Sequence, residues 1–384
     1  MVEKCPVLIA VESLAHGGCE RDAAKIAIGL DRERFSPHVA VFREGGFRRP
    51  EVEAAGVPIL DIPVTSFLSP RVVWTEARKL GAYIRRHRIQ LIHAFDVPVD
   101  IFCAPVARLY GVPVVITAQL SFRNMYARSR QMVLWLTDRI ADRVVVNSRA
   151  VGESLKKEWG LPEERIYLCY NGVNPADFYP GPGTRPAAFG PDALVVGSVC
   201  VMRPEKRMDW VVRAFAEVYP LNPRMRLLLV GSGPEVENLQ ALAGRLGLTD
   251  VCHFEPGTPR VLNWMQAMDI YINSSSSESF PNALLEAMAC GCCVIGSNVG
   301  GIPELITHRE DGLVFDAQNA AHLTEMLRLA VTDDSLRQKM RQQAAATAQQ
   351  RFSIAITLRR TEDLYQSLLE KKGIRLRESS IARC

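Results

Sequence analysis

The chain has 384 residues, which is long for a single hydrophobic core and favours two domains. Hydrophobic residues make up 48% and charged residues 23%, a balance typical of packed globular proteins. Because no apolar run is long enough to cross a bilayer and no signal peptide is visible, we expect a cytoplasmic protein and exclude an integral membrane protein. The ten cysteines are scattered through apolar contexts, which indicates reduced thiols rather than a disulfide framework.

The net charge of +4 is unevenly distributed, because residues 1–185 hold 25 Lys and Arg against 20 Asp and Glu. The excess gathers at 78–79, 85–88 and 123–130. A solvated helix face explains such a run, and so does a patch that meets anionic lipid or a phosphorylated acceptor. No nucleic-acid-binding motif of interleaved basic and aromatic residues accompanies these cations, so we do not expect a nucleic acid partner.

The first half of the chain alternates predicted strands and helices. An apolar strand at 5–11 leads through a loop into a helix at 21–30, and in that loop Gly17 and Gly18 let the backbone approach a ligand closely. Further strands are predicted at 38–42, 57–62, 91–95, 114–117 and 143–147, with a long helix at 71–88. This alternation predicts a doubly wound, mostly parallel α/β sheet.

A segment rich in Pro and Gly at 178–186 predicts a linker, after which the alternation restarts. Strands are predicted at 193–199, 226–230, 251–254, 269–273, 294–297 and 313–315, which gives a second doubly wound domain. Gly231 and Gly233 follow a strand, but the third glycine and the acidic residue of a dinucleotide fingerprint are missing, so no nicotinamide cofactor is expected. Cys290, Cys292 and Cys293 lack a second Cys/His pair, so buried thiols are predicted in place of a metal site.

Two loops of the second domain carry charged candidates. Arg203 and Lys206 lie in the turn after the strand at 193–199, where a cation could neutralise a diphosphate without a metal. Glu278 lies in a loop between a strand and a helix predicted at 282–289, and Glu286 follows on that helix. Such a loop, at the carboxyl end of a parallel sheet, is where open α/β folds bind ligands, and the unpaired amides of a helix start can hold a phosphate.

The segment from Glu278 to Glu286, with seven residues between the two glutamates, closely resembles the signature of retaining GT-B glycosyltransferases of glycosyltransferase family 4. The resemblance continues through residues 286–291 and 299–304. It implies two Rossmann-like domains that face each other across a cleft. Their expected ranges are 1–180 for the acceptor side and 187–350 for the nucleotide sugar. A helix at 351–372 is expected to return to the first domain, followed by a basic tail at 373–384.

The same resemblance implies roles for individual residues. In this family the first glutamate faces the donor sugar and the second holds the ribose, which implies Glu278 and Glu286 here. Lys206, which occupies the lysine position of a G-R-L-x-P-E-K loop, is implied to hold the diphosphate. The remaining donor-side residues are implied by the family's Gly-Gly loop and by the amides at the predicted helix start: Gly17, Gly18, Phe280, Pro281 and Asn282.

The sequence also departs from the family pattern. Val201 and Cys200 replace the usual Arg and Gly, so Arg203 is the candidate for the second cation. Gln119 stands where many relatives have a histidine, and an amide cannot shuttle a proton at neutral pH. With Gln119, we take His93 and Arg123 as candidates on the acceptor side.

The resemblance predicts a retaining glycosyltransferase. It would move a sugar from a nucleotide diphosphate sugar to a hydroxyl of a glycan or a lipid-linked glycan, as in polysaccharide, lipopolysaccharide or glycolipid biosynthesis. No metal and no cofactor besides the donor is implied. For the basic first domain, contact with the inner face of a membrane stays an open alternative to a solvated surface. Two alternatives stay open at this point: a nucleotide-sugar epimerase or hydrolase with the same fold, and a non-catalytic subunit that docks a partner transferase.

Overall fold

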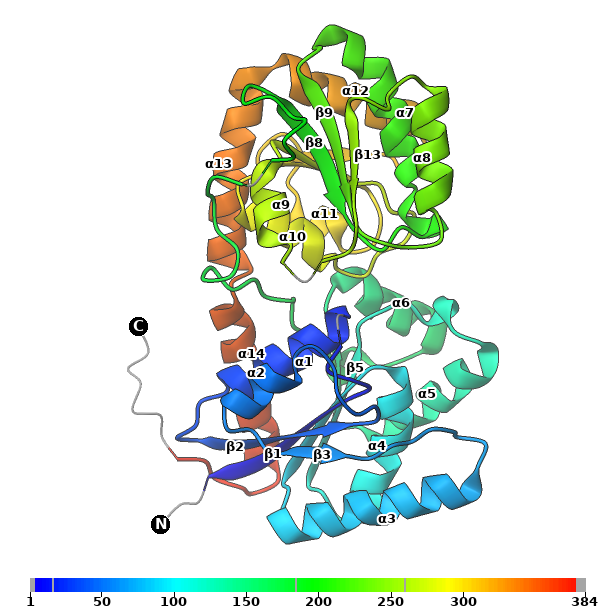
Figure 1. Ribbon diagram of the computed structural model, residues 1–384. Coiled ribbons are helices and arrows are strands. Elements are labelled where there is room, and N and C mark those ends of the chain that lie inside the picture. The colour runs from blue at the N-terminus through cyan, green and yellow to red at the C-terminus, as the bar shows by residue number, and fades with distance from the viewer. Residues whose placement is uncertain (1–3, 16, 184, 259, 378–384) are drawn as a thin grey trace. The chain divides into compact units, whose positions relative to one another are not determined.

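The computed structural model contains two parallel sheets, each covered by helices (Figure 1). It describes residues 4–15, 17–183, 185–258 and 260–377. The chain divides into two compact units, the first made of residues 1–171 and 354–384 and the second of residues 172–353. The predicted α/β class, with two doubly wound parallel sheets, is confirmed.

Unit 1 has a seven-stranded sheet in the order β3-β2-β1-β4-β5-β6-β7, and all its described strand pairs are parallel. The strands hold long runs of buried aliphatic residues, as expected where helices cover both faces of a parallel sheet. Their bounds are β1 Cys5–Val11, β2 Phe35–Val41, β3 Ile59–Asp61, β4 Leu91–Phe95, β5 Val114–Gln119, β6 Arg143–Val146 and β7 Ile166–Leu168. The helices are α1 Gly18–Gly29, α2 Arg49–Ala54, α3 Pro70–His87, α4 Val97–Leu109, α5 Arg128–Ile140, α6 Arg149–Trp159 and α14 Ile354–Lys371.

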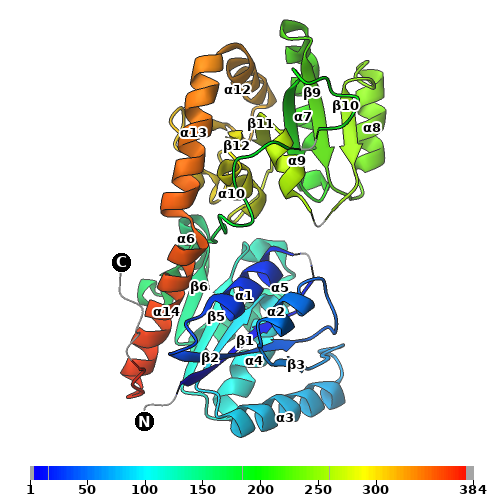
Figure 2. The ribbon, with the colours of Figure 1, turned by 60° about the vertical axis from the view of Figure 1, so that its left-hand side comes forward.

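The last helix, α14, belongs to unit 1 although it follows the whole of unit 2 in the chain. It lies beside α1, and its residues Leu364, Tyr365, Leu368 and Leu369 are part of the core beneath that helix (Figure 2). On strand β4, the Nδ1 atom of His93 lies 2.8 Å from the hydroxyl of Tyr365. A residue 272 positions after His93 in the chain therefore completes the packing around β4.

Unit 2 has a six-stranded sheet in the order β10-β9-β8-β11-β12-β13, again with parallel pairs throughout its described strands. Its strands are β8 Leu194–Val199, β9 Met225–Val230, β10 Cys252–Glu255, β11 Ile270–Asn273, β12 Cys293–Ser297 and β13 Leu313–Phe315. Its helices are α7 Met208–Val218, α8 Val236–Arg245, α9 Leu262–Ala267, α10 Asn282–Ala289, α11 Ile302–Leu305, α12 Ala320–Thr332 and α13 Asp334–Arg351.

The segment that the sequence predicted as a linker packs onto unit 2. The Gln266 side chain donates a hydrogen bond to the Tyr179 carbonyl at 2.8 Å, and a Cβ atom at Gly183 would lie 2.0 Å from the Ala267 amide nitrogen. The boundary between the units therefore lies at 171/172, earlier than the expected end of the first domain at residue 180.

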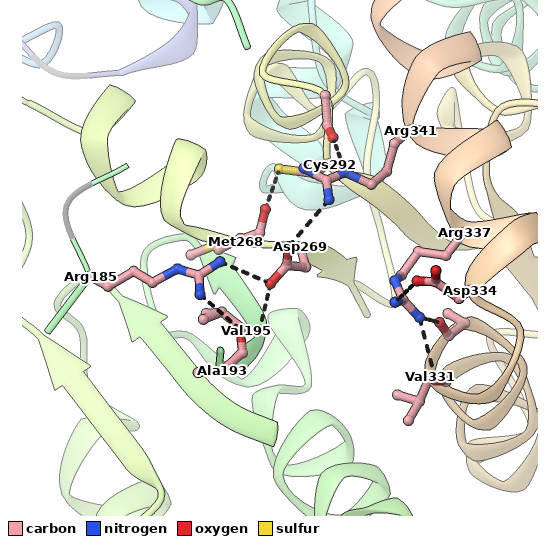
Figure 3. A network of polar contacts seen from close by, with 12 residues as sticks. Arg185, Ala193, Val195, Met268, Asp269, Cys292, Val331, Asp334, Arg337 and Arg341 are labelled. Carbon is pink, nitrogen blue, oxygen red and sulfur yellow. Dashed lines mark hydrogen bonds and ion pairs between the residues drawn. The ribbon is translucent and has the colours of Figure 1, made fainter. Parts of the chain in front are cut away.

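A polar network anchors this segment at the amino end of β11 (Figure 3). The Asp269 carboxylate accepts hydrogen bonds from Arg185 at 3.2 Å, from the Val195 amide at 2.9 Å and from Arg341 at 3.2 Å. Arg341 also donates to the Gly291 carbonyl at 2.8 Å. One carboxylate thus connects the entering segment, strand β8 and helix α13.

Candidate functional site

In unit 2 the candidate donor residues gather where the strand order reverses, between β8 and β11. Ligands of open α/β sheets bind at this kind of switch point, outside the carboxyl ends of the strands. The turn after β8 holds Lys206, and the loop after β11 holds Glu278. The Lys206 ammonium donates a hydrogen bond to the Glu278 carboxylate, and both side chains are largely sheltered from solvent.

Serine hydroxyls join these two loops. Ser274 is buried, and its hydroxyl donates to the carbonyls of Lys206 at 2.7 Å and Arg207 at 3.1 Å. The amide of Ser276 donates to the Glu205 carbonyl at 2.8 Å. Because these contacts fix the backbone on both sides of Lys206, the position of its side chain relative to Glu278 is defined by the fold.

Another hydroxyl orients the glutamate itself. The Ser275 hydroxyl donates to Glu278 Oε1 at 2.9 Å, and the Ser297 hydroxyl, at the end of β12, holds the Ser275 carbonyl at 2.7 Å. Sequence reasoning treated this serine run only as a loop. The feature visible in the sequence is a run of hydroxyl side chains directly before a charged residue. Sequence alone does not show which serine bonds to which group.

Helix α10 begins directly after this loop. Pro281 precedes its first residue, Asn282, and Phe280 is buried with its ring centroid 5.7 Å from that of Phe352. Glu286 is a buried residue of the same helix. The structure therefore brings Lys206, Glu278 and the start of α10 into one region of unit 2, with Glu286 further along the helix.

Arg203, the candidate second cation, is placed differently. Its side chain is 59% exposed and lies 3.9 Å from the Glu205 carboxylate, and no described contact joins it to Glu278. Val201 and Cys200 belong to the same turn. The structure thus places one of the two predicted cations, Lys206, against the glutamate.

The Gly-x-Gly turn after β9 has a packing explanation. Gly231 and Gly233 have φ angles of +147° and +153°, a region that side chains disfavour. A Cβ atom at Gly231 would lie 1.8 Å from the Cys200 carbonyl oxygen, and one at Gly233 would lie 2.4 Å from the Met202 carbonyl oxygen. These glycines let the turn pack against the segment that leads to Lys206.

Unit 1 presents its own switch point between β1 and β4. Gly17 occupies the position before α1 and Gly18 is the first residue of that helix, directly beyond the carboxyl end of β1. Asp96 follows β4 with a φ of +83° and accepts a hydrogen bond from the Val97 amide at 2.7 Å. Burial, with a smaller contribution from repulsion by the nearby carboxylates of Glu12 and Glu20, raises the pKa of the Asp96 carboxyl to about 6. Sequence reasoning missed Asp96, whose only signal is an acidic residue directly after a predicted strand.

Two of the acceptor-side candidates lie in a buried network behind this edge. The Gln119 amide donates to Asp100 at 3.1 Å, and Arg123 donates to Gln119 Oε1 at 3.2 Å and pairs with Asp138. All four side chains are buried. Burial, followed by repulsion from Asp138, raises the pKa of Asp100 well above its usual range. Arg123 is therefore not part of the exposed basic run in which the sequence placed it.

The third acceptor-side candidate, His93, lies inside the core of unit 1. Besides its contact with Tyr365, its ring lies 4.2 Å from that of Phe95, measured between centroids. Burial lowers the pKa of His93 to about 3, so its imidazole is neutral near pH 7. This placement favours a role in holding α14 over contact with an acceptor.

Groups of three or more His, Cys, Asp or Glu side chains arranged to hold a metal ion do not occur among the described residues. Cys290, Cys292 and Cys293 are buried, and the Cys292 thiol lies 3.3 Å from the Met265 carbonyl. No helix in the described ranges combines the length and apolar character that a membrane crossing requires.

Known protein families match both units of the chain. The model of glycosyl transferases group 1 matches residues 185–347, and the model of Glycosyltransferase Family 4 matches residues 16–177. The D-inositol 3-phosphate glycosyltransferase of Streptomyces bingchenggensis is 30% identical over 240 residues, which cover 59% of this chain and 52% of that protein. The chain spans about half the length of the curated relatives it matches.

Solved structures share the fold at lower identity. HepE of Anabaena, in complex with UDP and glucose, superposes with a TM-score of 0.81 at 21% identity, over 94% of this chain and 100% of that one. WaaG, a glycosyltransferase involved in lipopolysaccharide biosynthesis, gives a TM-score of 0.70 at 20% identity, over 93% and 99% of the two chains. Since the two family models together span most of the sequence, the chain belongs to the group 1 glycosyltransferases of glycosyltransferase family 4, with the GT-B fold.

Proposed function

We propose that this protein is a retaining glycosyltransferase that moves a sugar from a nucleotide diphosphate sugar to a hydroxyl of a glycan or a lipid-linked glycan. The observation that carries the proposal is the contact between Lys206 and Glu278 at the switch point of unit 2, beside the start of α10. A cation and a carboxylate at this place can bind the two chemically different parts of such a donor, its diphosphate and its sugar hydroxyls.

Each residue has a defined part in this proposal. The Lys206 ammonium neutralises the diphosphate as it leaves, with the first amides of α10 as further donors. Glu278, oriented by the Ser275 hydroxyl, accepts hydrogen bonds from the donor sugar. Glu286 holds the ribose. The diphosphate is bound by these groups of the chain, and the proposal assigns no metal to it.

The reaction proposed is a front-side displacement at the anomeric carbon. The bond from that carbon to the diphosphate oxygen breaks while the acceptor oxygen forms its bond on the same face, which retains the configuration. The acceptor's proton passes to the departing phosphate oxygen. No protein base is required, which agrees with an amide at Gln119 and with its buried position.

Thermal unfolding with UDP, GDP or ADP, each with and without Mg²⁺, tests the proposal first. A ligand at 100 times its Kd stabilises the folded protein by about 2.7 kcal/mol, so the donor nucleotide should raise the Tm clearly. The shift should persist without Mg²⁺ and shrink in Lys206→Ala. Lys339→Ala, which removes an exposed lysine of α13, is the matched control and should keep the full shift.

Turnover then separates the proposal from its alternatives. Donor consumed at full rate without any acceptor would assign a hydrolase or epimerase. A chain that no nucleotide stabilises, and whose Glu278→Gln variant supports the same transferase activity as wild type in cell extracts, would be a non-catalytic subunit. Transfer that needs an acceptor and is lost in Glu278→Gln supports the proposal.

A further inference from the structure

Two helices of unit 1 expose large apolar side chains to solvent. Leu68, just before α3, is 94% exposed, and Trp74 in its second turn is 61% exposed. On α5, Leu136 is 54% exposed, and Met132 and Val133 lie exposed beside it. Leaving such side chains in water on two helices is unfavourable for a surface that meets only solvent, so these positions indicate a contact partner.

The same two helices expose cations without exposed acids. On α3 the exposed faces carry Arg71, Arg78, Lys79, Arg85 and Arg86, and on α5 they carry Arg128, Arg130 and Arg139. Between residues 62 and 141, all of which the structure describes, no acidic side chain is exposed, and none of these cations forms an ion pair with a described residue. The Arg78 guanidinium lies over the Trp74 ring at 4.6 Å, and the Arg139 guanidinium lies over the Trp135 ring at 3.4 Å. A surface of this composition is complementary to an extended anionic layer with an apolar interior.

The positions of these residues along their helices indicate which edge of the unit 1 sheet lies beside this surface. Helix α4 packs between α3 and α5 in one layer, so the two exposed faces lie roughly 20 Å apart, about two helix spacings. In a parallel α/β unit the helices start at the carboxyl edge of the sheet, and Leu68, Trp74 and Met132 lie near the starts of their helices. Gly17, Gly18 and Asp96 lie at the same edge.

We infer that the outer faces of α3 and α5, here called the α3–α5 face, dock onto an anionic lipid bilayer. The apolar side chains enter the interfacial layer while the guanidinium and ammonium groups contact lipid phosphates. Docking lays α3 and α5 on the membrane, and the apolar side chains near their starts hold the carboxyl edge of the unit 1 sheet at its surface. This inference rests on the proposed glycosyl transfer, and it assigns the acceptor to the lipid-linked class.

Vesicle flotation with the full chain tests the inference. Vesicles of phosphatidylcholine with phosphatidylglycerol should bind the protein, vesicles of phosphatidylcholine alone should bind it at least tenfold more weakly, and added salt should weaken binding. Each lost cation near an anionic surface lowers affinity about fivefold, so Arg128→Glu/Arg130→Glu should reduce binding at least about 25-fold. Leu136→Glu should reduce it at least about tenfold.

Matched controls come from unit 2. Leu221, which is 49% exposed, and the exposed Arg245 offer Leu221→Glu and Arg245→Glu, both expected to bind vesicles within twofold of wild type. The α5 variants should keep the wild-type Tm and its shift with the donor nucleotide, which shows that the fold and the unit 2 site are intact.

Several results would overturn the inference. Equal binding to the two kinds of vesicle would do so, and so would wild-type binding by Leu136→Glu. Saturable binding of a soluble sugar phosphate that Arg128→Glu/Arg130→Glu abolishes, with no vesicle binding, would instead assign this face to a phosphorylated acceptor. Vesicle binding without any nucleotide-dependent Tm shift would refute the proposed glycosyl transfer but not the membrane docking.

Discussion

At the scale of single residues, the candidate donor site of unit 2 contains a lysine and a glutamate that form an ion pair. In the proposed reaction the diphosphate and Glu278 both attract the Lys206 ammonium, so the donor must share or take over that cation. Serine hydroxyls of the loop after β11 bond to the Lys206 carbonyl and to the Glu278 carboxylate, which limits how far either side chain has to move. The site is therefore organised in advance, which lowers the cost of ordering it when donor binds.

Replacement of Lys206 by alanine should lower kcat/KM about 100-fold or more, because one preorganised charge next to a leaving group contributes on that scale. Arg203→Ala should cost less than about tenfold, since the Arg203 side chain points into solvent near Glu205. Steady-state kinetics of both variants with the same donor and acceptor measure the difference. Equal losses would show that Arg203 reaches the diphosphate in the bound state.

Single residues also show where sequence reasoning stopped. The spacing of Glu278 and Glu286 and the position of Lys206 in a turn were visible in the sequence, and the resemblance gave each a role. The hydrogen bond from Ser275 to Glu278 and the burial of Gln119 and Arg123 were not visible in the sequence. They depend on contacts between segments that only folding brings together. A histidine in a strand looks the same in sequence whether it faces a ligand or a helix, so the contact of His93 with Tyr365 is not visible there.

At the scale of elements, strand prediction succeeded where apolar runs were bounded by turn residues. The expected strand at 91–95 and the expected helix at 282–289 match β4 and α10 residue for residue. The strand expected at 38–42 is Phe35–Val41 in the structure, and Pro37 lies within it. The ion pairs of Asp269 with Arg185 and Arg341 leave no local pattern in the sequence, so they could not be predicted from it.

Removal of the Asp269 charge tests whether that network supports unit 2. Asp269→Asn should lower the free energy of unfolding by about 2–3 kcal/mol, because two arginines lose a shared charged acceptor. Asp334→Asn is the matched control from the same view (Figure 3), since Asp334, whose side chain is 74% exposed, also pairs with an arginine, Arg337. It should cost less than about 1 kcal/mol. Urea unfolding of both variants gives the comparison.

The contact of β4 with α14 should be sensitive to pH. The pKa of His93 is about 3 in the folded protein against 6.5 for the free side chain, so only the unfolded state takes up its proton as the pH falls below 6.5. Stability contributed by neutral His93 is therefore complete above pH 6.5 and is lost progressively toward pH 3, at about 1.4 kcal/mol per pH unit.

Urea unfolding of wild type and His93→Asn at pH 7.5 and 5.5 measures this effect. Wild type should lose about 1 kcal/mol more than the variant between these two values, and opposite contributions such as that of Asp96 cancel in the comparison. Parallel losses in the two proteins would mean that His93 takes up its proton in the folded state as well.

At the scale of the whole molecule, unit 1 is discontinuous in sequence and unit 2 is not. A chain ending at residue 353 lacks Leu364, Tyr365, Leu368 and Leu369, which are buried in the core of unit 1. Each such side chain stabilises the fold by roughly 2 kcal/mol, and their sum is comparable to the whole stability of a domain. Unit 1 of the truncated chain should therefore be unfolded.

Residues 172–353 alone should unfold cooperatively and keep the Tm shift with the donor nucleotide, because their core and the Lys206 site lie within them. Circular dichroism and thermal unfolding of the truncated chain and of this fragment compare the two units. A truncated chain with full unit 1 structure would show that α14 is dispensable for folding.

The position of α14 also determines the order in which the protein is completed on the ribosome. Strands β1 to β7 are synthesised first, yet the groove that receives α14 stays open until residues 354–371 have left the exit tunnel. Unit 2 has all its residues available before then and can finish first. The apolar groove of unit 1 is thus exposed through most of translation, which makes the nascent first half a natural client for chaperones.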